Sequence, residues 1–352
     1  MKKILIVLFL IILVTGGYFA WKIFGPSVHQ PKGKYFYIQT GEGYAQVRQA
    51  LLDSQIIENK MVFEQIAKKL DYPQHVKPGR YFIPEGTSII HLIRKLRSGD
   101  QAPVNLVISR KIRIKEDLAK ITGNRFEFDA ADMYHYLENN DSLRKFGLDS
   151  TSFVSAIFPD TYTFFWNSTP DKIMTKLFEA SQKFWTEERK IKAAAIGLTP
   201  LQVYTLASIV EEESNYAPEK PEIASVYLNR IARGIPLQAD PTIKFAMKDF
   251  SLRRILNSHL RTVSPYNTYL NKGLPPGPIC TVQKQTIDAV LDAPKTDYIY
   301  FVAKSDFSGS HIFTSDYDDH LKYARLYQKA IDSLLKAKQK DKDAAAAEKV
   351  EK

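Results

Sequence analysis

An uncharged run at the amino terminus limits what this chain can fold into. Two lysines are followed by mostly apolar residues from Ile4 to Trp21, and the next charge is Lys22. About 18 residues at ~1.5 Å per residue approach the ~30 Å thickness of the hydrocarbon layer of a bilayer. The run therefore predicts an uncleaved membrane anchor over residues 4–21, preceded by a cytoplasmic stub of residues 1–3.

The alternative is a secretory signal peptide that is cleaved after its apolar core. Ile4–Val14 has the length of such a core, and the small residues 15–17 follow it. The apolar character continues through Tyr18 and Trp21, which fit an aromatic belt at a membrane interface and favour the anchor. Under either interpretation the rest of the chain is exported. We expect a single-pass protein of the cell (inner) membrane with its globular part on the periplasmic side.

Composition narrows the class of the exported part. With 352 residues, 44% of them hydrophobic, the chain is long enough for two domains or for one large domain with a smaller companion. The net charge of +10 suits an acidic polymer, but no Lys/Arg block or nucleic-acid motif is present, so we expect no nucleic-acid partner. The single cysteine, Cys280, permits no intramolecular disulfide and is expected to be a buried apolar side chain.

The spacing of apolar residues predicts an α+β fold of short strands and amphipathic helices. Strands are expected at 35–39, 80–83, 104–108 and 298–303, and helices at 44–52, 61–70, 89–96, 171–184, 200–213, 221–233 and 318–336. The expected parts are a linker at 22–34, a small α/β module at 35–105, a connecting region at 106–165, a larger mixed α+β domain at 166–336 and a flexible tail at 337–352. The stretch 237–281 is rich in Pro, Asn and Gly and is expected to be mostly loop.

One predicted helix ends in three glutamates, Glu211, Glu212 and Glu213, and begins with a capping box at Thr199. An apolar stripe should face the core, which turns Glu212 into water and leaves Glu211 and Glu213 at the edge of buried surface. A carboxyl group beside apolar surface has a raised pKa and can donate a proton and take it back. The alternative is a solvated acidic face. Periodicity does not choose between Glu211 and Glu213.

Five segments of the chain resemble one bacterial family. They are FPDTYTF (158–164), ASIVEEES (207–214), IASVYLNRIARGIPLQADPT (223–242), SPYNTYLNKGLPPGPI (264–279) and YFVAKSDFSGSHIFTSDYDDH (300–320). In this order they resemble the YceG-like family, the membrane-anchored endolytic murein transglycosylases. The resemblance covers nearly the whole exported chain.

The resemblance implies a specific reaction and two domains with different roles. Family members carry a LysM-like module, which falls on residues 35–105, before a catalytic domain, which falls on 166–336. The implied enzyme is a lyase that cleaves the bond between N-acetylmuramic acid and N-acetylglucosamine in nascent peptidoglycan strands and leaves a 1,6-anhydro end. This activity would terminate strand elongation and would place the protein near peptidoglycan synthases. The family's catalytic glutamate corresponds to Glu211.

One carboxyl group suffices for this reaction because the 6-hydroxyl of the sugar replaces water as the nucleophile. We expect Glu211 to protonate the leaving oxygen and later accept the hydroxyl proton. Amide and aromatic side chains bind sugars by hydrogen bonds and stacking, although each could instead stabilise a loop. The candidates for substrate binding are Glu213, Gln238, Asp240, Tyr266, Asn267 and Tyr269.

The remaining expectations concern cofactors and rival functions. The seven histidines lack the spacing of metal ligands, and no nucleotide-binding glycine pattern is present, so no metal or cofactor is expected. One rival function is a non-catalytic, membrane-anchored peptidoglycan-binding protein, in which Glu211 has only a structural role. The other is a muramidase that uses water and two carboxylates.

Overall fold

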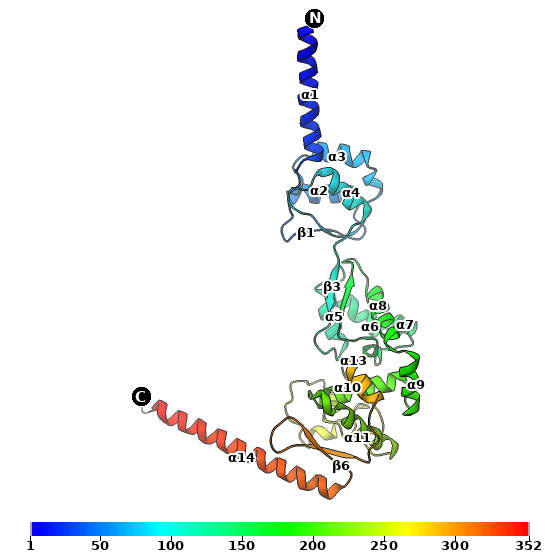
Figure 1. The fold of residues 1–352 in the computed structure, drawn as a ribbon, viewed down its shortest axis with the longest axis vertical. Helices are drawn as coiled ribbons and strands as arrows, with labels where there is room; N and C mark the ends of the chain where they lie inside the picture. The colour runs from blue at the N-terminus through cyan, green and yellow to red at the C-terminus, as the bar shows by residue number, and fades with distance from the viewer. Residues whose placement is uncertain (1, 351–352) are drawn as a thin grey trace. The chain divides into compact units, whose positions relative to one another are not determined.

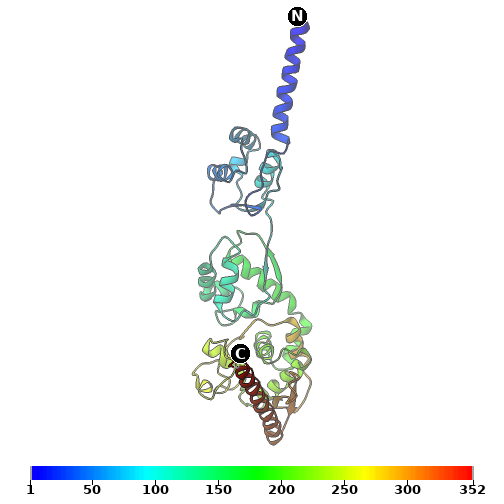
Figure 2. The same ribbon diagram turned by 90° about the vertical axis from the view of Figure 1, so that its left-hand side faces the viewer.

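A computed structural model describes residues 2–350 (Figures 1 and 2). Residue 1 of the expected stub and residues 351–352 of the expected tail lie outside the described residues. The fold is mixed α+β, with three small two-stranded antiparallel sheets in the described part. The chain divides into two compact units. Unit 1 comprises Met1–Val107, Ala119–Tyr134 and Thr161–Ile173, and unit 2 comprises Ile108–Leu118, His135–Asp160 and Met174–Lys352.

The amino-terminal helix α1 spans Lys2–Phe24. Within it, Ile6–Tyr18 is the apolar stretch. Among the described residues, no single helix is long and apolar enough to cross a bilayer. Only α9 (Glu187–Ala195) and α10 (Pro200–Glu213) taken together reach that length and composition, and they meet at an angle of 76°.

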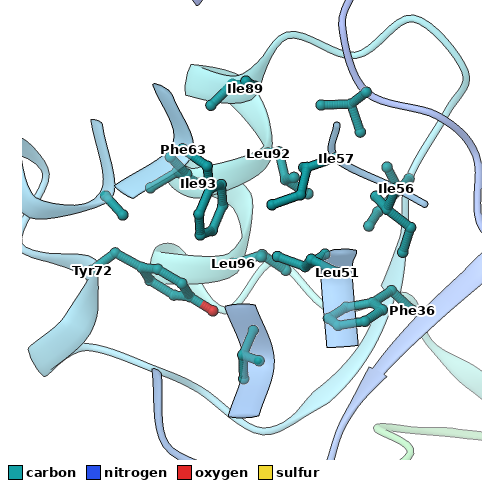
Figure 3. Close-up of a cluster of buried hydrophobic side chains, with 14 of the residues drawn as sticks. Phe36, Leu51, Ile56, Ile57, Phe63, Tyr72, Ile89, Leu92, Ile93 and Leu96 are labelled. Carbon is teal, nitrogen blue, oxygen red and sulfur yellow. The ribbon is translucent and has the colours of Figure 1, made fainter. Parts of the chain in front are cut away.

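The first part of unit 1 is built on a two-stranded sheet and three helices. Strand β1 (Tyr35–Ile38) pairs antiparallel with β2 (Gly79–Phe82). The helices are α2 (Tyr44–Asp53), α3 (Lys60–Lys69) and α4 (Ile89–Ser98), with a short 3₁₀ turn, η1 (Tyr72–Gln74). The apolar faces predicted from periodicity meet in one buried cluster (Figure 3). Figure 3 shows Leu51, Phe63 and Leu96 converging there from α2, α3 and α4.

A second sheet explains why the units are not continuous in sequence. Strand β3 (Val104–Val107) pairs antiparallel with β4 (Thr161–Phe164), which follows it by more than fifty residues. This pairing joins the segment that follows β4 to unit 1, whereas the parts expected from the sequence were continuous stretches. Between β3 and β4 in the sequence lie α5 (Lys115–Gly123), α6 (Ala130–Glu138), α7 (Asn140–Arg144) and the 3₁₀ turn η2 (Phe153–Ala156). Helix α8 (Pro170–Phe184) follows β4.

Unit 2 is organised around α10, which packs against α11 (Lys220–Ala232), α12 (Asp240–Met247) and α13 (Lys284–Leu291) (Figure 1). The capping box is confirmed: Thr199 Oγ1 accepts from the backbone of Gln202, and Gln202 Oε1 accepts from that of Thr199. The remaining elements are η3 (Ala217–Glu219), η4 (His259–Arg261), the hairpin β5 (Tyr300–Ala303) and β6 (His311–Thr314), and α14 (Tyr317–Val350).

The expectation that α10 has one apolar stripe was wrong. Every residue from Val203 to Glu211 is buried, including Tyr204 and Ile209 on other faces. Because α10 is surrounded by other elements, even Ser208 is enclosed, and its hydroxyl bonds to the backbone of Thr205 and Ile279. A helix that is enclosed on all sides has no solvent face for periodicity to reveal.

Candidate active site

The first glutamate of α10, Glu211, lies in a closed ion pair. Its Oε2 accepts a hydrogen bond from Lys220 Nζ at 2.7 Å and a second from the hydroxyl of Thr286. The same Nζ donates to Thr286 Oγ1 at 2.8 Å. The side chains of Glu211 and Lys220 are only 10% and 11% exposed. This cluster therefore ties the end of α10 to α11 and α13.

The second glutamate, Glu212, does not point into water as expected. Its Oε1 lies 3.0 Å from Lys111 Nζ and 2.9 Å from the Arg113 guanidinium, and its side chain is 17% exposed. Burial alone would raise the pKa of Glu212, but the two cations outweigh it and hold the pKa below its usual value. The segment before α5 supplies both cations, so periodicity along α10 could not anticipate them.

The third glutamate, Glu213, faces a larger cavity than Glu212 does. Its Oε1 accepts a hydrogen bond from the Tyr227 hydroxyl at 2.5 Å. Burial raises the pKa of Glu213 to about 7, and the negative charge of Asp240 adds to the rise, while the Tyr227 hydrogen bond and Lys244 oppose it. A carboxyl group with this pKa is partly protonated at neutral pH. It can therefore both give and take a proton there.

The cavity beside Glu213 has a volume of about 420 Å³, enough for a sugar ring and its substituents. Its walls come from α10, α11, the start of α12, the following loop, β5 and the start of α14. Its polar and aromatic lining consists of Glu213, Tyr227, Arg230, Gln238, Asp240, Tyr269, Tyr300, Phe301, Tyr317 and His320. Glu211 lines neither this cavity nor the smaller one of about 40 Å³ beside Glu212.

Arg230 provides a fixed positive charge in the cavity wall. Its Nε donates to the Ile299 carbonyl at 2.7 Å, and one terminal nitrogen donates to the Leu237 carbonyl at 3.0 Å and to Gln238 Oε1 at 3.2 Å. Burial lowers its pKa, but an arginine remains charged at neutral pH. Burial, followed by the charge of Arg230, lowers the pKa of His320, so this imidazole is neutral there.

Three of the residues expected to bind substrate meet at this cavity with Glu213. They are Gln238, Asp240 and Tyr269. The Tyr269 hydroxyl donates to Asp240 Oδ1 at 2.6 Å, which links the loop after α12 to the start of that helix. Gln238 has a left-handed backbone with φ of 55°, and its backbone N–H donates to the Thr268 carbonyl at 3.0 Å. The local backbone thus presents all three side chains on one wall.

The other two expected binding residues lie elsewhere. Asn267 is fully buried, and its amide donates to the carbonyls of Leu260 and Thr262 at 2.9 and 2.8 Å. Its Oδ1 accepts from the backbone of Tyr269, so Asn267 stabilises the loop, which was the structural alternative. Tyr266 packs against the Phe245 ring at 4.5 Å and does not line the Glu213 cavity.

Sequence reasoning missed more than half of the residues that line the Glu213 cavity. Tyr227 and Arg230 lie three residues apart on α11, so they share a face, and both fall in a segment that carries the family resemblance. Tyr300 and His320 begin and end another such segment. The spacing on α11 was a usable signal. No signal in the sequence indicated that β5 and the start of α14 lie beside Glu213.

Comparisons with known proteins agree on one family. The sequence model of the YceG-like family matches residues 36–326. The endolytic murein transglycosylase of Bacillus subtilis (strain 168) is 29% identical over 343 residues, covering 90% of this chain and 91% of that protein. The endolytic murein transglycosylase of Streptococcus pneumoniae serotype 2 is 25% identical, and the alignment covers 89% of this chain but only 62% of that longer protein. A crystal structure of a yceG-like protein from Listeria monocytogenes superposes with a TM-score of 0.55 at 25% identity, covering 82% of this chain and 98% of that one.

Proposed function

The chain belongs to the YceG-like family, and we propose that it is an endolytic lytic transglycosylase that cleaves peptidoglycan glycan strands. The names of its relatives support this reaction class, and the Glu213 cavity supports it chemically. The observation that carries the proposal is a carboxyl group with a pKa of about 7 in a cavity of sugar size. We assign the acid and base role to Glu213.

The reaction needs one proton to leave Glu213 and one to return. Protonated Glu213 donates to the oxygen between N-acetylmuramic acid and N-acetylglucosamine, and the C1–O bond breaks with its electron pair going to that oxygen. The 6-hydroxyl oxygen of the muramic acid then bonds to C1, and its proton passes to the Glu213 carboxylate. The products are a 1,6-anhydro end and a free hydroxyl on the leaving sugar. No water is consumed, and the carboxyl group is restored for the next cycle.

The surrounding residues fit this cycle. The Tyr227 hydroxyl stabilises the carboxylate after the first transfer, because a hydrogen bond to the charged form lowers its energy. The fixed Arg230 charge and the neutral His320 offer polar partners to sugar substituents. Tyr269, Tyr300 and Tyr317 provide ring faces for stacking on a pyranose.

This assignment moves the catalytic role away from the residue expected from the sequence. Lys220 and Thr286 already occupy Oε2 of Glu211, and this residue does not line the cavity beside Glu213. We propose that Glu211 is a positioning residue that holds the last turn of α10 in place, two residues before Glu213.

Mass spectrometry of the products tests the reaction. Purified glycan strands incubated with the protein are expected to yield fragments with 1,6-anhydro ends, each lighter by one water than a reducing end. Reducing ends would instead identify a muramidase, with Asp240 as the available second carboxylate in the cavity. Binding of strands without cleavage would identify a non-catalytic cell-wall protein.

Three further features belong to the same proposal. The apolar run 4–21 in α1 anchors the protein in the cell membrane, with the Glu213 cavity on the periplasmic side. Residues 35–105 form a LysM-like module. Cleavage of nascent strands beside peptidoglycan synthases then limits strand length. Deletion of residues 1–24 should move the protein from the membrane fraction to the soluble fraction, and recovery in the membrane fraction would contradict the anchor.

A further inference from the structure

The outer face of the β1–β2 sheet is aromatic, which is unusual for a face turned to solvent. Phe36 and Ile38 of β1 and Tyr81 of β2 point into the core of unit 1. Alternation therefore turns Tyr37 and Phe82 outward, where they are 42% and 39% exposed. A two-stranded antiparallel sheet with one wet face normally carries polar residues there. The exposed rings of Tyr37 and Phe82 make this face a candidate ligand-binding surface.

A cavity of about 520 Å³ opens on this face, within unit 1. Its aromatic lining consists of Tyr37, Phe126 and Trp166. Tyr37 meets Trp166 edge to face, with 4.9 Å between the ring centroids. Trp166 follows β4 in the sequence, and β4 pairs with β3. The Trp166 indole contacts Tyr37 on the outer face of the β1–β2 sheet. We refer to this space as the Trp166 cavity.

The polar part of the Trp166 cavity is cationic. Arg80 lies opposite Tyr37 in the sheet register, with its guanidinium 4.1 Å from the Tyr35 ring centroid. Its Nε is buried and has no hydrogen-bond partner among the residues that the structure describes. Arg125 is exposed and donates to the Asn105 carbonyl at 3.2 Å. The residues that line the cavity include these two arginines, the amide of Asn124 and no acidic side chain.

We propose that the Trp166 cavity is a second, non-catalytic glycan-binding site that takes a carboxylate-bearing segment of the strand. The inference rests on the proposed function, which supplies the substrate class. Ring faces stack on the sugar, and Arg80 and Arg125 bind the carboxylate. The carboxylate comes either from the lactyl group of a peptide-free strand or from the stem peptide of an intact strand.

A second binding site changes which strands the enzyme binds most tightly. A strand long enough to occupy both the Trp166 cavity and the Glu213 cavity binds more tightly than a short one, because the second contact is made within the same complex. The site therefore favours long, acidic strands over short fragments. The chemistry at Glu213 does not depend on it.

Binding measurements on the full-length protein in detergent test this site. The parent carries Glu213→Gln, so that strands are bound without turnover, and affinity is measured by calorimetry. The three probes are peptide-free strands, intact uncross-linked strands and neutral chitin oligosaccharides of similar length. The site variants are Trp166→Ala and Arg125→Ala. The matched controls are Phe165→Ala, an exposed neighbouring ring, and Arg97→Ala, an exposed arginine on α4, neither of which lines the cavity.

Trp166→Ala should weaken binding of both acidic probes about tenfold or more, as expected for the loss of one aromatic contact. Arg125→Ala should weaken binding of the acidic probes about tenfold and leave that of chitin unchanged. The acidic probe that loses more affinity identifies the source of the carboxylate. Arg125 is on the surface, so its variant remains informative if Trp166→Ala lowers the melting temperature.

Unchanged affinity in both site variants, or equal losses in the two controls, would overturn the second site. Its failure is distinct from failure of the proposed function, because affinity is measured without turnover. Conversely, a wild-type protein that produces no anhydro ends would refute the proposed reaction. The measured affinities would still decide whether the Trp166 cavity binds glycan.

Discussion

Glu211 and Glu213 lie two residues apart on α10 but in opposite environments. Glu211 meets an ammonium and a hydroxyl within a packed contact between helices. Glu213 meets one tyrosine hydroxyl and an open cavity. Glu211 is buried and Glu213 is half-buried, so burial alone does not distinguish a structural acid from a catalytic one. The difference lies in whether a partner has already taken the position that a substrate would need.

The two glutamates also differ in how the loss of hydration of the carboxylate is compensated. At Glu211 the Lys220 charge compensates for the lost hydration. At Glu213 the Tyr227 hydrogen bond only partly compensates, and burial leaves the pKa at about 7. A carboxyl group that is only partly compensated and lines a cavity is a candidate functional group. The following predictions separate the two glutamates, from the largest expected effect to the smallest.

Replacing Glu213 by Gln should abolish cleavage. The amide keeps the shape of the side chain but has no acidic proton to donate, and loss of a general acid typically lowers rates by about 10²–10⁴. We expect a fall of about a thousandfold or more in the release of anhydro ends, measured by chromatography and mass spectrometry. Substantial cleavage by this variant would remove Glu213 from the mechanism.

Replacing Glu211 by Gln should act mainly on stability. It leaves the Lys220 ammonium buried without its counter-ion, a change that costs about 3–5 kcal/mol for buried pairs. The urea midpoint should fall, while the rate per folded molecule stays within about tenfold of wild type. Replacing both Glu211 and Lys220 by Met is the matched control and should recover part of the stability. A thousandfold loss of rate in a folded Glu211→Gln protein would restore Glu211 as the acid.

Replacing Tyr227 by Phe should shift the pH dependence of cleavage upward. The Tyr227 hydrogen bond lowers the pKa of Glu213 against the effect of burial, so its loss lets that pKa rise above about 7. The acid must be protonated when the substrate binds, and kcat/KM therefore falls as the pH rises through this pKa. The alkaline limb of the profile should move to higher pH. A limb that stays in place would show that Tyr227 does not act on the catalytic group.

Replacing Asp240 by Asn should produce a smaller shift in the opposite direction. The Asp240 charge raises the pKa of Glu213, so a neutral side chain lets that pKa fall and moves the alkaline limb to lower pH. KM is expected to rise as well because Asp240 lines the cavity. Asp249→Asn, a change at a half-buried acid that does not line the cavity, is the control and should change neither quantity.

Much of the fold could be predicted where local signals were strong. The apolar faces of α2, α3 and α4 and the capping box of α10 gave element bounds within one or two residues of those observed. Helix α12 was missed, because it is short and begins at Asp240-Pro241 inside a stretch rich in loop-forming residues. Its packing against α10 is a tertiary effect that composition does not carry.

The candidate site was predicted only in part. Helical spacing reduced the choice to Glu211 and Glu213, and resemblance then favoured Glu211. The structural argument for Glu213 depends on Lys220 from α11 and Thr286 from α13, which occupy Oε2 of Glu211. It depends equally on β5 and the start of α14, which leave a space beside Glu213. Neither arrangement is encoded in the spacing along α10. The burial of Asn267 likewise depends on its bonds to the carbonyls of Leu260 and Thr262, which the residue type alone does not reveal.

The most direct measurement is the titration of the glutamate carboxyl carbons by ¹³C NMR in the intact protein. The account predicts one resonance that titrates near pH 7, remains in Glu211→Gln and is absent from Glu213→Gln. A resonance near pH 7 that disappears with Glu211 instead, or the absence of any glutamate that titrates in this range, would contradict the assignment of Glu213 as the acid.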